Sequence, residues 1–487
     1  MSLLLLCIYF FSILYFFYRQ GKKLEHTTST LLPALFVVKF GAGLFFLYVY
    51  TYIYGGGELT ADAGAFFRES KILHGVFEKS PSDYFRYIFN IDLSPEFVDK
   101  HLRLTQHWNG TQKPFFNDSQ NVLRVNSLLL FLSKGQVITH ILFMCAFSFW
   151  GVFECFKWVK QYSKIKEKYV LMLLLLLPSL AFWSSSFIKE PLLILGFGLF
   201  LNGLFYKKNS STVKIIKLLI GSLLVLSFKP YVFVCLLPVL LFLMIQFVFK
   251  QKTIIFGLGA MALLFIVLLS VPTTRNTIVN KISNQQRDFI NVGLGGLHLF
   301  RNDTIYFFEG VERGKMKQEG NLVYLIKETE GALVVDKQNY GMETVKIPAD
   351  PEPWFVLHQS EGSASSFNTT RINGSFSTLI TMVPEVLLNV MFRPFPGDNG
   401  SWLIYLAMTE NIVFAFLFLG ALFWLRRALA PTERSIIVAL SLFALCLYLI
   451  IGYTTPVTGA IVRYKIPGVL ALMCILCIFF EPKKRIT

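Results

Sequence analysis

Residues 157–178 read KWVKQYSKIKEKYVLMLLLLLP, and this stretch decides the fold class. It joins a segment with five lysines to an unbroken apolar run. An apolar run of near-span length crosses a bilayer as a helix, because lipid offers no water to backbone N–H and C=O groups. A basic segment beside such a run marks the cytoplasmic side of the membrane. The stretch therefore predicts a helical membrane protein.

Composition supports that prediction over the whole chain. The 487 residues are 54% hydrophobic and 16% charged, whereas soluble domains are about 25% charged. The net charge is +16, and most basic clusters lie in short loops between apolar segments. This distribution is typical of the positive-inside rule rather than of nucleic-acid binding, so we expect no nucleic-acid partner. The seven cysteines lie in or beside apolar segments, which predicts no disulfide framework.

The hydropathy pattern predicts a polytopic, all-α bundle of about eleven transmembrane helices. The spans lie near residues 2–18, 31–53, 137–158, 169–186, 191–206, 213–228, 231–249, 253–272, 402–425, 435–453 and 466–480. With this number of spans, every basic tail falls on one side of the membrane. We therefore expect a bacterial inner (cytoplasmic) membrane protein with a periplasmic N-terminus and a cytoplasmic C-terminus.

Two long regions fall on the outer side of this single integral membrane domain, which covers residues 1–487. They are the first outer loop, 54–136, and the second outer loop, 273–401, and aromatic residues in them predict order. Short apolar stretches in both loops predict interfacial or re-entrant helices. The inner loops are short and carry no nucleotide-binding motif. Any chemistry should therefore occur at the outer face on a lipid-borne substrate.

Several cations stand in outer turns, where the positive-inside rule predicts few. They are Lys189, Lys229, Arg393, Arg463 and Lys465. One reading is that they converge on the phosphate or pyrophosphate of a substrate, which Arg binds in bidentate fashion and Lys as a point charge. The other reading is a set of unrelated structural ion pairs and headgroup contacts.

Acidic residues follow the second predicted span in YGGGELTAD, residues 54–62. Asp62 is the candidate general base and Glu58 the alternate, although Asp62 can equally cap an interfacial helix. Lys39 and Glu410 are charged residues inside predicted spans. Such residues are functional candidates by default, and an ion pair between the two is the alternative.

The segments PSLAFWSSSFIKEPLLILG, SFKPYV, GSASSFNTTRINGSFSTLITMVPEVLLNVMFRPFPGD and TGAIVRYKIPGVLAL resemble a group of multispanning bacterial proteins. That poorly characterised group is associated with the Bacteroidetes and with envelope-polysaccharide gene sets. Its members show a WSSGxxKD-like turn where this chain has WSSSFIKE, and GGD where this chain has GGGELTAD. The second departure leaves open whether Glu58 or Asp62 matches the family acid.

The layout also resembles, more distantly, the GT-C class of integral-membrane glycosyltransferases. Those enzymes carry an acid at the start of a long first outer loop, use polyprenyl-phosphate sugars, and often have an Arg–Tyr–(Arg/Lys)–x–Pro stretch. RYKIP, residues 463–467, matches that stretch. The resemblance implies that Asp62 is the base and that Lys229, Arg393, Arg463 and Lys465 contact the lipid phosphate.

These observations predict a membrane-embedded glycosyltransferase or glycan polymerase that uses a polyprenyl-(pyro)phosphate-linked sugar at the periplasmic face. Its partners would be a lipid-linked sugar donor, a glycan or protein acceptor, and membrane lipid. No nucleotide is needed and no cofactor is assigned; a divalent metal stays open, although no ligand cluster of defined spacing is visible. The alternatives are a transporter or flippase of a lipid-linked substrate and a non-catalytic scaffold of an envelope assembly or secretion complex.

Overall fold

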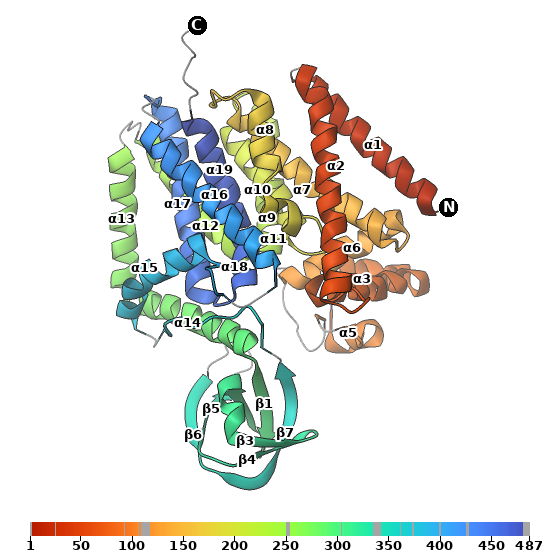
Figure 1. The fold of residues 1–487 in the computed structure, drawn as a ribbon, viewed down its shortest axis with the longest axis vertical. Helices are drawn as coiled ribbons and strands as arrows, with labels where there is room; N and C mark the ends of the chain where they lie inside the picture. Colours follow the sequence, from red (N-terminus) through yellow and green to blue (C-terminus); the bar gives the residue numbers. More distant parts are fainter. Residues whose placement is uncertain are drawn as a thin grey trace. The chain divides into compact units, whose positions relative to one another are not determined.

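The computed structural model describes residues 2–24, 26–91, 93–105, 107–108, 117–249, 254–302, 304–334, 342–360, 362–372, 375–398, 401–424 and 428–480. The chain is mostly helical and divides into two compact units. The first comprises Met1–Gly257, Ala415–Ala444 and Ile466–Thr487, and the second comprises Leu258–Phe414 and Leu445–Lys465. Figure 1 labels the elements of both units.

The described residues contain seven helices that are long and apolar enough to cross a membrane, or nine if each of two bent helix pairs counts as one span. This confirms the prediction of several apolar spans and indicates a multi-pass membrane protein. The predicted number of about eleven is not reached by this criterion. The predicted span 169–186 is divided into two short helices at Pro178, since the residue before a proline disfavours helical geometry. The predicted span 191–206 forms a helix of 16 residues.

Helices make up the described part of the first unit. They are α1 (Ser2–Lys22), α2 (His26–Tyr48), the π-helix η1 (Val49–Ile53), α3 (Ala61–Lys79), α4 (Pro81–Phe89), α5 (Pro95–Leu102), α6 (Asp118–Ser133), α7 (Val137–Val159), α8 (Glu167–Leu175), α9 (Pro178–Trp183), α10 (Glu190–Phe205), α11 (Ser211–Phe228), α12 (Pro230–Val248) and α19 (Ile466–Phe479). Parts of α16 (Leu403–Trp424) and α17 (Pro431–Thr454) also belong to it.

Helix α10 packs tightly between α7 and α11. A Cβ atom on Gly151 of α7 would overlap the backbone of Ile194, and one on Gly198 of α10 would overlap the backbone of Gly151. Small residues at such crossings let helix backbones approach closely, which is how helices associate where lipid removes the hydrophobic driving force. The crossing fixes α10, whose first residue follows the turn that holds Lys189.

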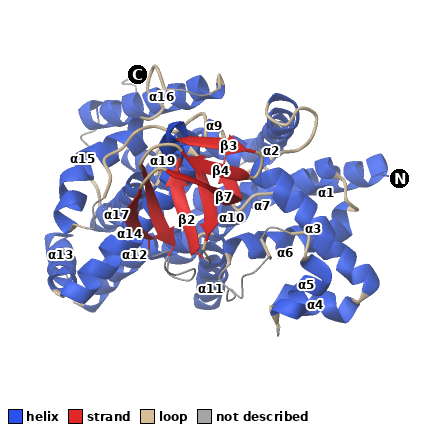
Figure 2. Cartoon of the chain, turned by 90° about the horizontal axis from the view of Figure 1, so that it is seen from below, coloured by secondary structure: helices blue, strands red, loops and turns tan. Residues whose placement is uncertain are grey.

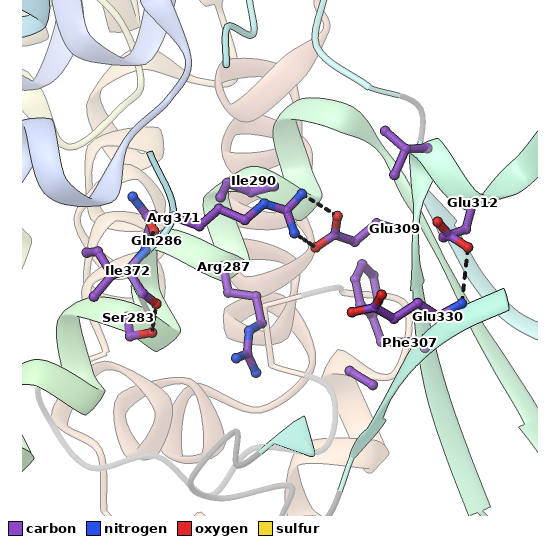
Figure 3. Close-up of a pocket in the computed structure, with 13 residues that line it drawn as sticks. Ser283, Gln286, Arg287, Ile290, Phe307, Glu309, Glu312, Glu330, Arg371 and Ile372 are labelled. Carbon is purple, nitrogen blue, oxygen red and sulfur yellow. Dashed lines mark hydrogen bonds and ion pairs between the residues drawn. The ribbon is translucent and has the colours of Figure 1, made fainter. Parts of the chain in front are cut away.

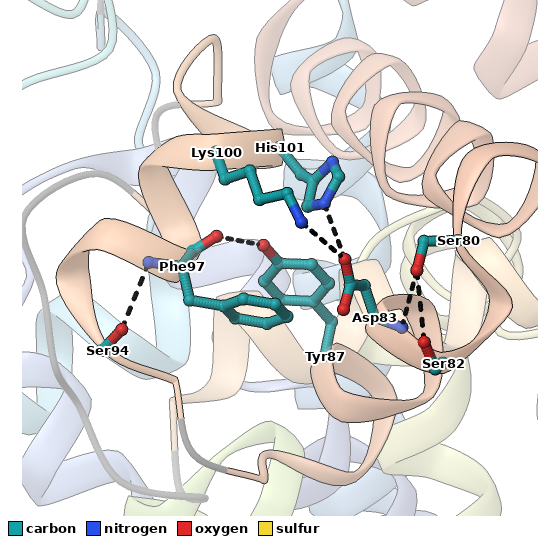
Figure 4. A network of polar contacts seen from close by, with 8 residues as sticks. All are labelled: Ser80, Ser82, Asp83, Tyr87, Ser94, Phe97, Lys100 and His101. Carbon is teal, nitrogen blue, oxygen red and sulfur yellow. Dashed lines mark hydrogen bonds and ion pairs between the residues drawn. The ribbon is translucent and has the colours of Figure 1, made fainter.

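The described residues of the predicted first outer loop form helices α3 to α6, in agreement with the order that its aromatic residues predicted. Asp83 of α4 joins α5 by accepting hydrogen bonds from Lys100 Nζ at 3.1 Å and His101 Nε2 at 3.0 Å (Figure 4). These two donors hold the pKa of the Asp83 carboxyl below its ordinary value. Tyr87 adds a hydrogen bond from its hydroxyl to the Phe97 carbonyl (Figure 4).

Lys39, within α2, caps the C-terminus of α9. Its side chain is buried, and Nζ donates to the carbonyls of Leu180 at 3.3 Å and Ala181 at 3.1 Å and to Ser184 Oγ at 2.7 Å. The last carbonyls of a helix lack partners within the helix, and an ammonium group complements them and the helix dipole. The buried charge therefore holds the base of the 184–190 turn.

The second unit combines helices with a β-sheet. Its helices are α13 (Ile254–Ser270), α14 (Pro272–Leu294), the 3₁₀-helix η2 (Gly310–Lys315), α15 (Phe376–Phe392) and α18 (Thr458–Tyr464), with the remaining parts of α16 and α17. Its strands are β1 (Gly296–Arg301), β2 (Thr304–Glu309), β3 (Met316–Glu319), β4 (Leu322–Leu325), β5 (Thr329–Val334), β6 (Met342–Ile347) and β7 (Asp350–Ser360). The direction of the chain changes by 91° between α13 and α14.

The all-α prediction is wrong for residues 296–360. These residues form a seven-stranded antiparallel sheet in the order β3-β4-β7-β1-β2-β5-β6 (Figure 2). Leu299, Phe308, Val323 and Trp354 are among the residues of its core. All strands except β7 have six residues or fewer, and β1 pairs with the distant β7 as well as with β2. Much of the sheet therefore depends on pairings that local hydropathy does not reveal.

Candidate functional site

The two predicted acids lie where α2 gives way to α3. Helix α2 ends in the π-helix η1, and a turn follows in which Gly56 and Gly57 have φ values of +59° and +110°. Backbone with positive φ favours glycine, which has no Cβ. Glu58 follows this turn, and its side chain is exposed. The chain then enters α3. Glu58 lies in the segment just before this helix, and Asp62 lies in the helix itself.

Asp62 lies in the first turn of α3, and its side chain is exposed. Thr60 occupies the N-cap position of α3. Asp62 therefore does not occupy the capping position that the alternative gave it. A carboxylate in the first turn still interacts favourably with the helix dipole. Ala61, just before it, has a φ of +53°, a conformation that costs a non-glycine residue about 1–2 kcal/mol. Such strain clusters at functional sites.

Helix α3 packs against the turn between α9 and α10. The ring of Phe67 stacks on that of Phe187 with centroids 4.7 Å apart. Lys189 Nζ lies 5.7 Å from the centroid of Phe66. Since Phe66 is four residues after Asp62, both lie on one face of α3. The helix that carries the candidate base therefore borders a predicted phosphate-binding lysine.

Lys189 is joined to the N-terminus of α6. Its Nζ lies 2.8 Å from Asp118 Oδ2 and 3.0 Å from Ser119 Oγ. The side chains of Lys189 and Asp118 are 15% and 38% exposed. Solvent screens the Asp118 side of this pair, so an anionic ligand can compete with Asp118 for the ammonium group. Lys189 is therefore a partly buried cation whose partner carboxylate is exposed.

Lys229, in the turn between α11 and α12, forms a buried ion pair with Glu190. Nζ lies 2.9 Å from Glu190 Oε1, with 5% and 1% of the two side chains exposed. Because Glu190 follows Lys189 in the chain, the pair brings both predicted lysines to one place. Asn121 of α6 also donates to the Ser227 carbonyl at 3.1 Å, which ties α6 to the end of α11.

These contacts define the α3–α6 site: Phe66 and Phe67 of α3, with Asp62 one helical turn before Phe66, the first turn of α6, the 184–190 turn and the Lys229 turn. Sequence reasoning identified Asp62, Lys189 and Lys229 as candidates. It missed that Asp118 is the partner of Lys189 and that Glu190 is the partner of Lys229. The polar run NDSQN, residues 117–121, has the form of a helix N-terminus and was the signal for α6. No local pattern revealed the partner of Lys229.

Arg393 and Lys465 belong to the second unit. Arg393 forms an ion pair with Asp398, and its guanidinium carbon lies 3.8 Å from the centroid of Phe367. Lys465 is buried, and its Nζ donates to the Val390 carbonyl at 3.1 Å and to Asn411 Oδ1 at 2.9 Å. Lys465 therefore caps the C-terminus of α15 as Lys39 caps that of α9.

Asn411 connects Arg393 to Lys465. Its Nδ2 donates to the carbonyl of Arg393 at 2.8 Å, while its Oδ1 accepts from Lys465. Arg463 lies in the last turn of α18, with its guanidinium carbon 5.8 Å from the ring centroid of Tyr464. Within the first unit, Glu190 thus links Lys229 to the turn that holds Lys189, and within the second unit Asn411 links Arg393 to Lys465, while Arg463 belongs to the same second unit.

The two charged residues inside apolar helices differ in their surroundings. The ammonium group of Lys39 is bound by the C-terminal carbonyls of α9 and by Ser184. Glu410 lies within α16 and is largely buried, with 9% of its surface exposed. The contacts of Lys39 explain its presence in a span without a catalytic role. Within the described part of the chain, no group of three or more His, Cys, Asp or Glu residues could hold a metal ion.

The buried Lys229–Glu190 pair gives a stability prediction. Lys229→Met should lower the free energy of unfolding of the first unit by about 3–5 kcal/mol, because it leaves an unpaired buried carboxylate. The double variant Lys229→Met/Glu190→Leu should recover most of that loss. Lys160→Met, which removes a more exposed ion pair with Glu167, should cost no more than about 1 kcal/mol. Thermal unfolding in one detergent measures all three, and a double variant no more stable than Lys229→Met contradicts the account.

Backbone strain at Ala61 gives a second prediction. Ala61→Gly should stabilise the chain by about 1 kcal/mol, because glycine adopts positive φ without a Cβ clash. The matched control is Ala65→Gly in the interior of the same helix, which should destabilise it by about 0.5–1 kcal/mol. Melting temperatures that move in the same direction for both variants would argue against strain at residue 61.

Comparisons of the chain with protein-family models, with curated proteins and with solved structures find no match. The resemblances stated from the sequence motifs therefore remain expectations. Layout alone does not establish function, so the functional argument rests on the contacts of the α3–α6 site.

Proposed function

We propose that the chain is a membrane-embedded glycosyltransferase or glycan polymerase that takes its sugar from a polyprenyl-(pyro)phosphate donor. The observation that carries the proposal is the contact between α3, which bears Asp62, and the turn that bears Lys189. A transferase of this kind needs a base for the acceptor hydroxyl and a cation for the phosphate that leaves. The α3–α6 site supplies one of each on neighbouring elements.

The proposed reaction is a displacement at the anomeric carbon of the donor sugar. The acceptor hydroxyl oxygen forms a bond to that carbon while the bond from carbon to phosphate oxygen breaks. The proton of the hydroxyl passes to the Asp62 carboxylate, and the bonding electron pair leaves with the phosphate. Lys189 stabilises the negative charge that develops on the phosphate oxygen. No nucleotide takes part in the reaction, and a divalent metal remains open.

The contacts rank the two lysines of the site. Lys189 is partly exposed and its partner Asp118 is more so, so a phosphate can displace the carboxylate at little cost. Lys229 is buried against Glu190, and exchange of that carboxylate for a ligand would require its removal from a low-dielectric contact. We therefore assign the phosphate contact to Lys189 first, while Lys229 and Glu190 hold the turn in place.

The proposed location is the outer face of the bacterial inner membrane, with a periplasmic N-terminus and a cytoplasmic C-terminus. The ring of His140, near the start of α7, lies 5.3 Å from that of Phe187 in the site. The other end of α7 carries Lys157 and Lys160. Basic residues favour the cytoplasmic side, so the site would face the periplasm. Its partners there would be the lipid-linked donor and a glycan or protein acceptor, in envelope polysaccharide or glycoconjugate assembly.

The acid gives the direct test. Asp62→Asn should lower transfer by about 10²–10⁴-fold, because the amide cannot accept the hydroxyl proton. The matched control is Glu58→Gln, which should leave transfer near the parent level. The measurement is transfer of label from a lipid-linked sugar fraction by membranes that contain each variant at equal abundance. If Glu58→Gln is the inactive variant, Glu58 is the base, and if both variants are active the proposed mechanism is wrong.

The Lys229–Glu190 ion pair specifically favours a non-catalytic scaffold as a second candidate, because a cation already neutralised by a buried carboxylate needs no ligand. The variant Lys189→Met separates the two functions. In a scaffold it removes a weak surface pair and should leave glycan assembly unchanged. In a transferase it should slow transfer at least about tenfold while the protein stays folded.

A further inference from the structure

The second unit holds a cavity of about 390 Å³ between α14 and one face of the sheet (Figure 3). Ser283, Gln286, Arg287 and Ile290 line it from α14, and Phe307 and Glu309 line it from β2. Neighbouring side chains of a strand point to opposite faces, so Phe307 faces the cavity while Phe308 enters the core of the sheet. The volume lies within the range of about 300–1,000 Å³ typical of small-molecule sites.

Charged groups of both signs line this cavity. Arg371 donates two hydrogen bonds to Glu309, at 2.8 Å and 2.6 Å. The side chain of Arg287 extends from α14 into the cavity, and Glu330 lies on the sheet side (Figure 3). Glu312 completes the acidic side and accepts a hydrogen bond from the backbone N–H of Glu330 at 3.1 Å. The lining therefore offers fixed donors and fixed acceptors within a single cavity.

A smaller cavity, of about 30 Å³, shares Ile290 and Arg371 with the first and is also lined by Phe367 and Asn368. The guanidinium carbon of Arg393 lies 3.8 Å from the centroid of the Phe367 ring. We refer to the two neighbouring cavities of the second unit together as the polar path.

We propose that this path binds an oligosaccharide segment. A sugar hydroxyl both donates and accepts hydrogen bonds, so it can pair with the carboxylates of Glu309 and Glu330 as well as with the guanidinium group of Arg287. Two arginines against three glutamates give the lining almost no net charge, which disfavours phosphate and strongly charged peptides. The predominance of charged side chains disfavours a purely apolar ligand, because their desolvation would not be compensated.

The saccharide site goes beyond the proposed function. It lies on α14, the sheet and the 362–372 segment, whereas the transfer site lies on α3, α6 and the two lysine turns. Binding of a saccharide at equilibrium needs no transfer, so either proposal can fail alone. If both hold, the path is a docking site for the growing or accepting glycan.

The test uses the purified full chain in lipid nanodiscs and two uncharged probes, cellohexaose and chitohexaose. Saturation-transfer NMR and calorimetry measure binding. At least one hexasaccharide should bind saturably, and Glu330→Gln and Arg287→Ala should each weaken that binding at least about tenfold, because each leaves a sugar hydroxyl without its partner. The matched control is Lys317→Gln, which removes an exposed charge on β3 outside the cavity and should leave binding unchanged.

Three results would overturn the proposal: no hexasaccharide binds, both cavity variants bind as the parent does, or Lys317→Gln weakens binding as much as they do. Competition by an acidic octapeptide or by inorganic phosphate in place of the saccharides would assign the cavity to another ligand class. Melting temperatures identify a variant that fails to fold. Glu330 is exposed, so we expect Glu330→Gln to fold. If Arg287→Ala does not fold, binding by Glu330→Gln decides the test.

Discussion

Two buried lysines bind the carbonyl groups at the C-terminal ends of helices, and the polar turns that follow these helices depend on the contacts. Lys39 holds the end of α9, and Lys465, with Asn411, holds the end of α15. A helix that ends away from water leaves up to four carbonyls without partners, and membranes tolerate such ends only where protein groups satisfy them. Each lysine therefore allows a helix to stop early and a polar turn to follow.

The turns that follow these caps carry the residues of functional interest. After α9 come Lys189 and Glu190, and after α15 comes Arg393. In the first unit the turn packs against α3, which bears Asp62, through contacts of Phe187 with Phe67 and of Lys189 with Phe66. The helix ends of the first unit thus carry an acid, Asp62, and a cation, Lys189. The buried Lys229–Glu190 ion pair holds the turn that contains Lys189. Such preorganised charges can stabilise a transition state without rearrangement.

Sequence reasoning identified the features that depend on local pattern. Hydropathy identified the apolar helices, and the predicted outer position of Lys189 and Lys229 led to the site that contains them. The sheet was missed because strands such as β1 and β7 are paired across a long separation in sequence. Glu190 was read as a turn residue, since nothing near it in the sequence shows that Lys229 is its partner.

The prediction of one pocket for five cations rested on charge and hydropathy, which led us to expect all five in turns on one side of the membrane. Their partners depend on tertiary contacts that local sequence does not show. Lys229 pairs with Glu190, the neighbour of Lys189, and Asn411 joins Arg393 to Lys465. The caps explain why Lys39 and Lys465 are lysines, whereas sequence alone treated both as candidates for chemistry.

The most direct measurement is an experimental structure of the protein in nanodiscs with a polyprenyl phosphate bound. The account predicts phosphate density in contact with Lys189 Nζ, with Asp118 displaced from it, on the side of α3 that bears Asp62, and with the Lys229–Glu190 pair intact. Phosphate density away from Lys189, with the Lys189–Asp118 pair unchanged, would contradict the proposed transfer site.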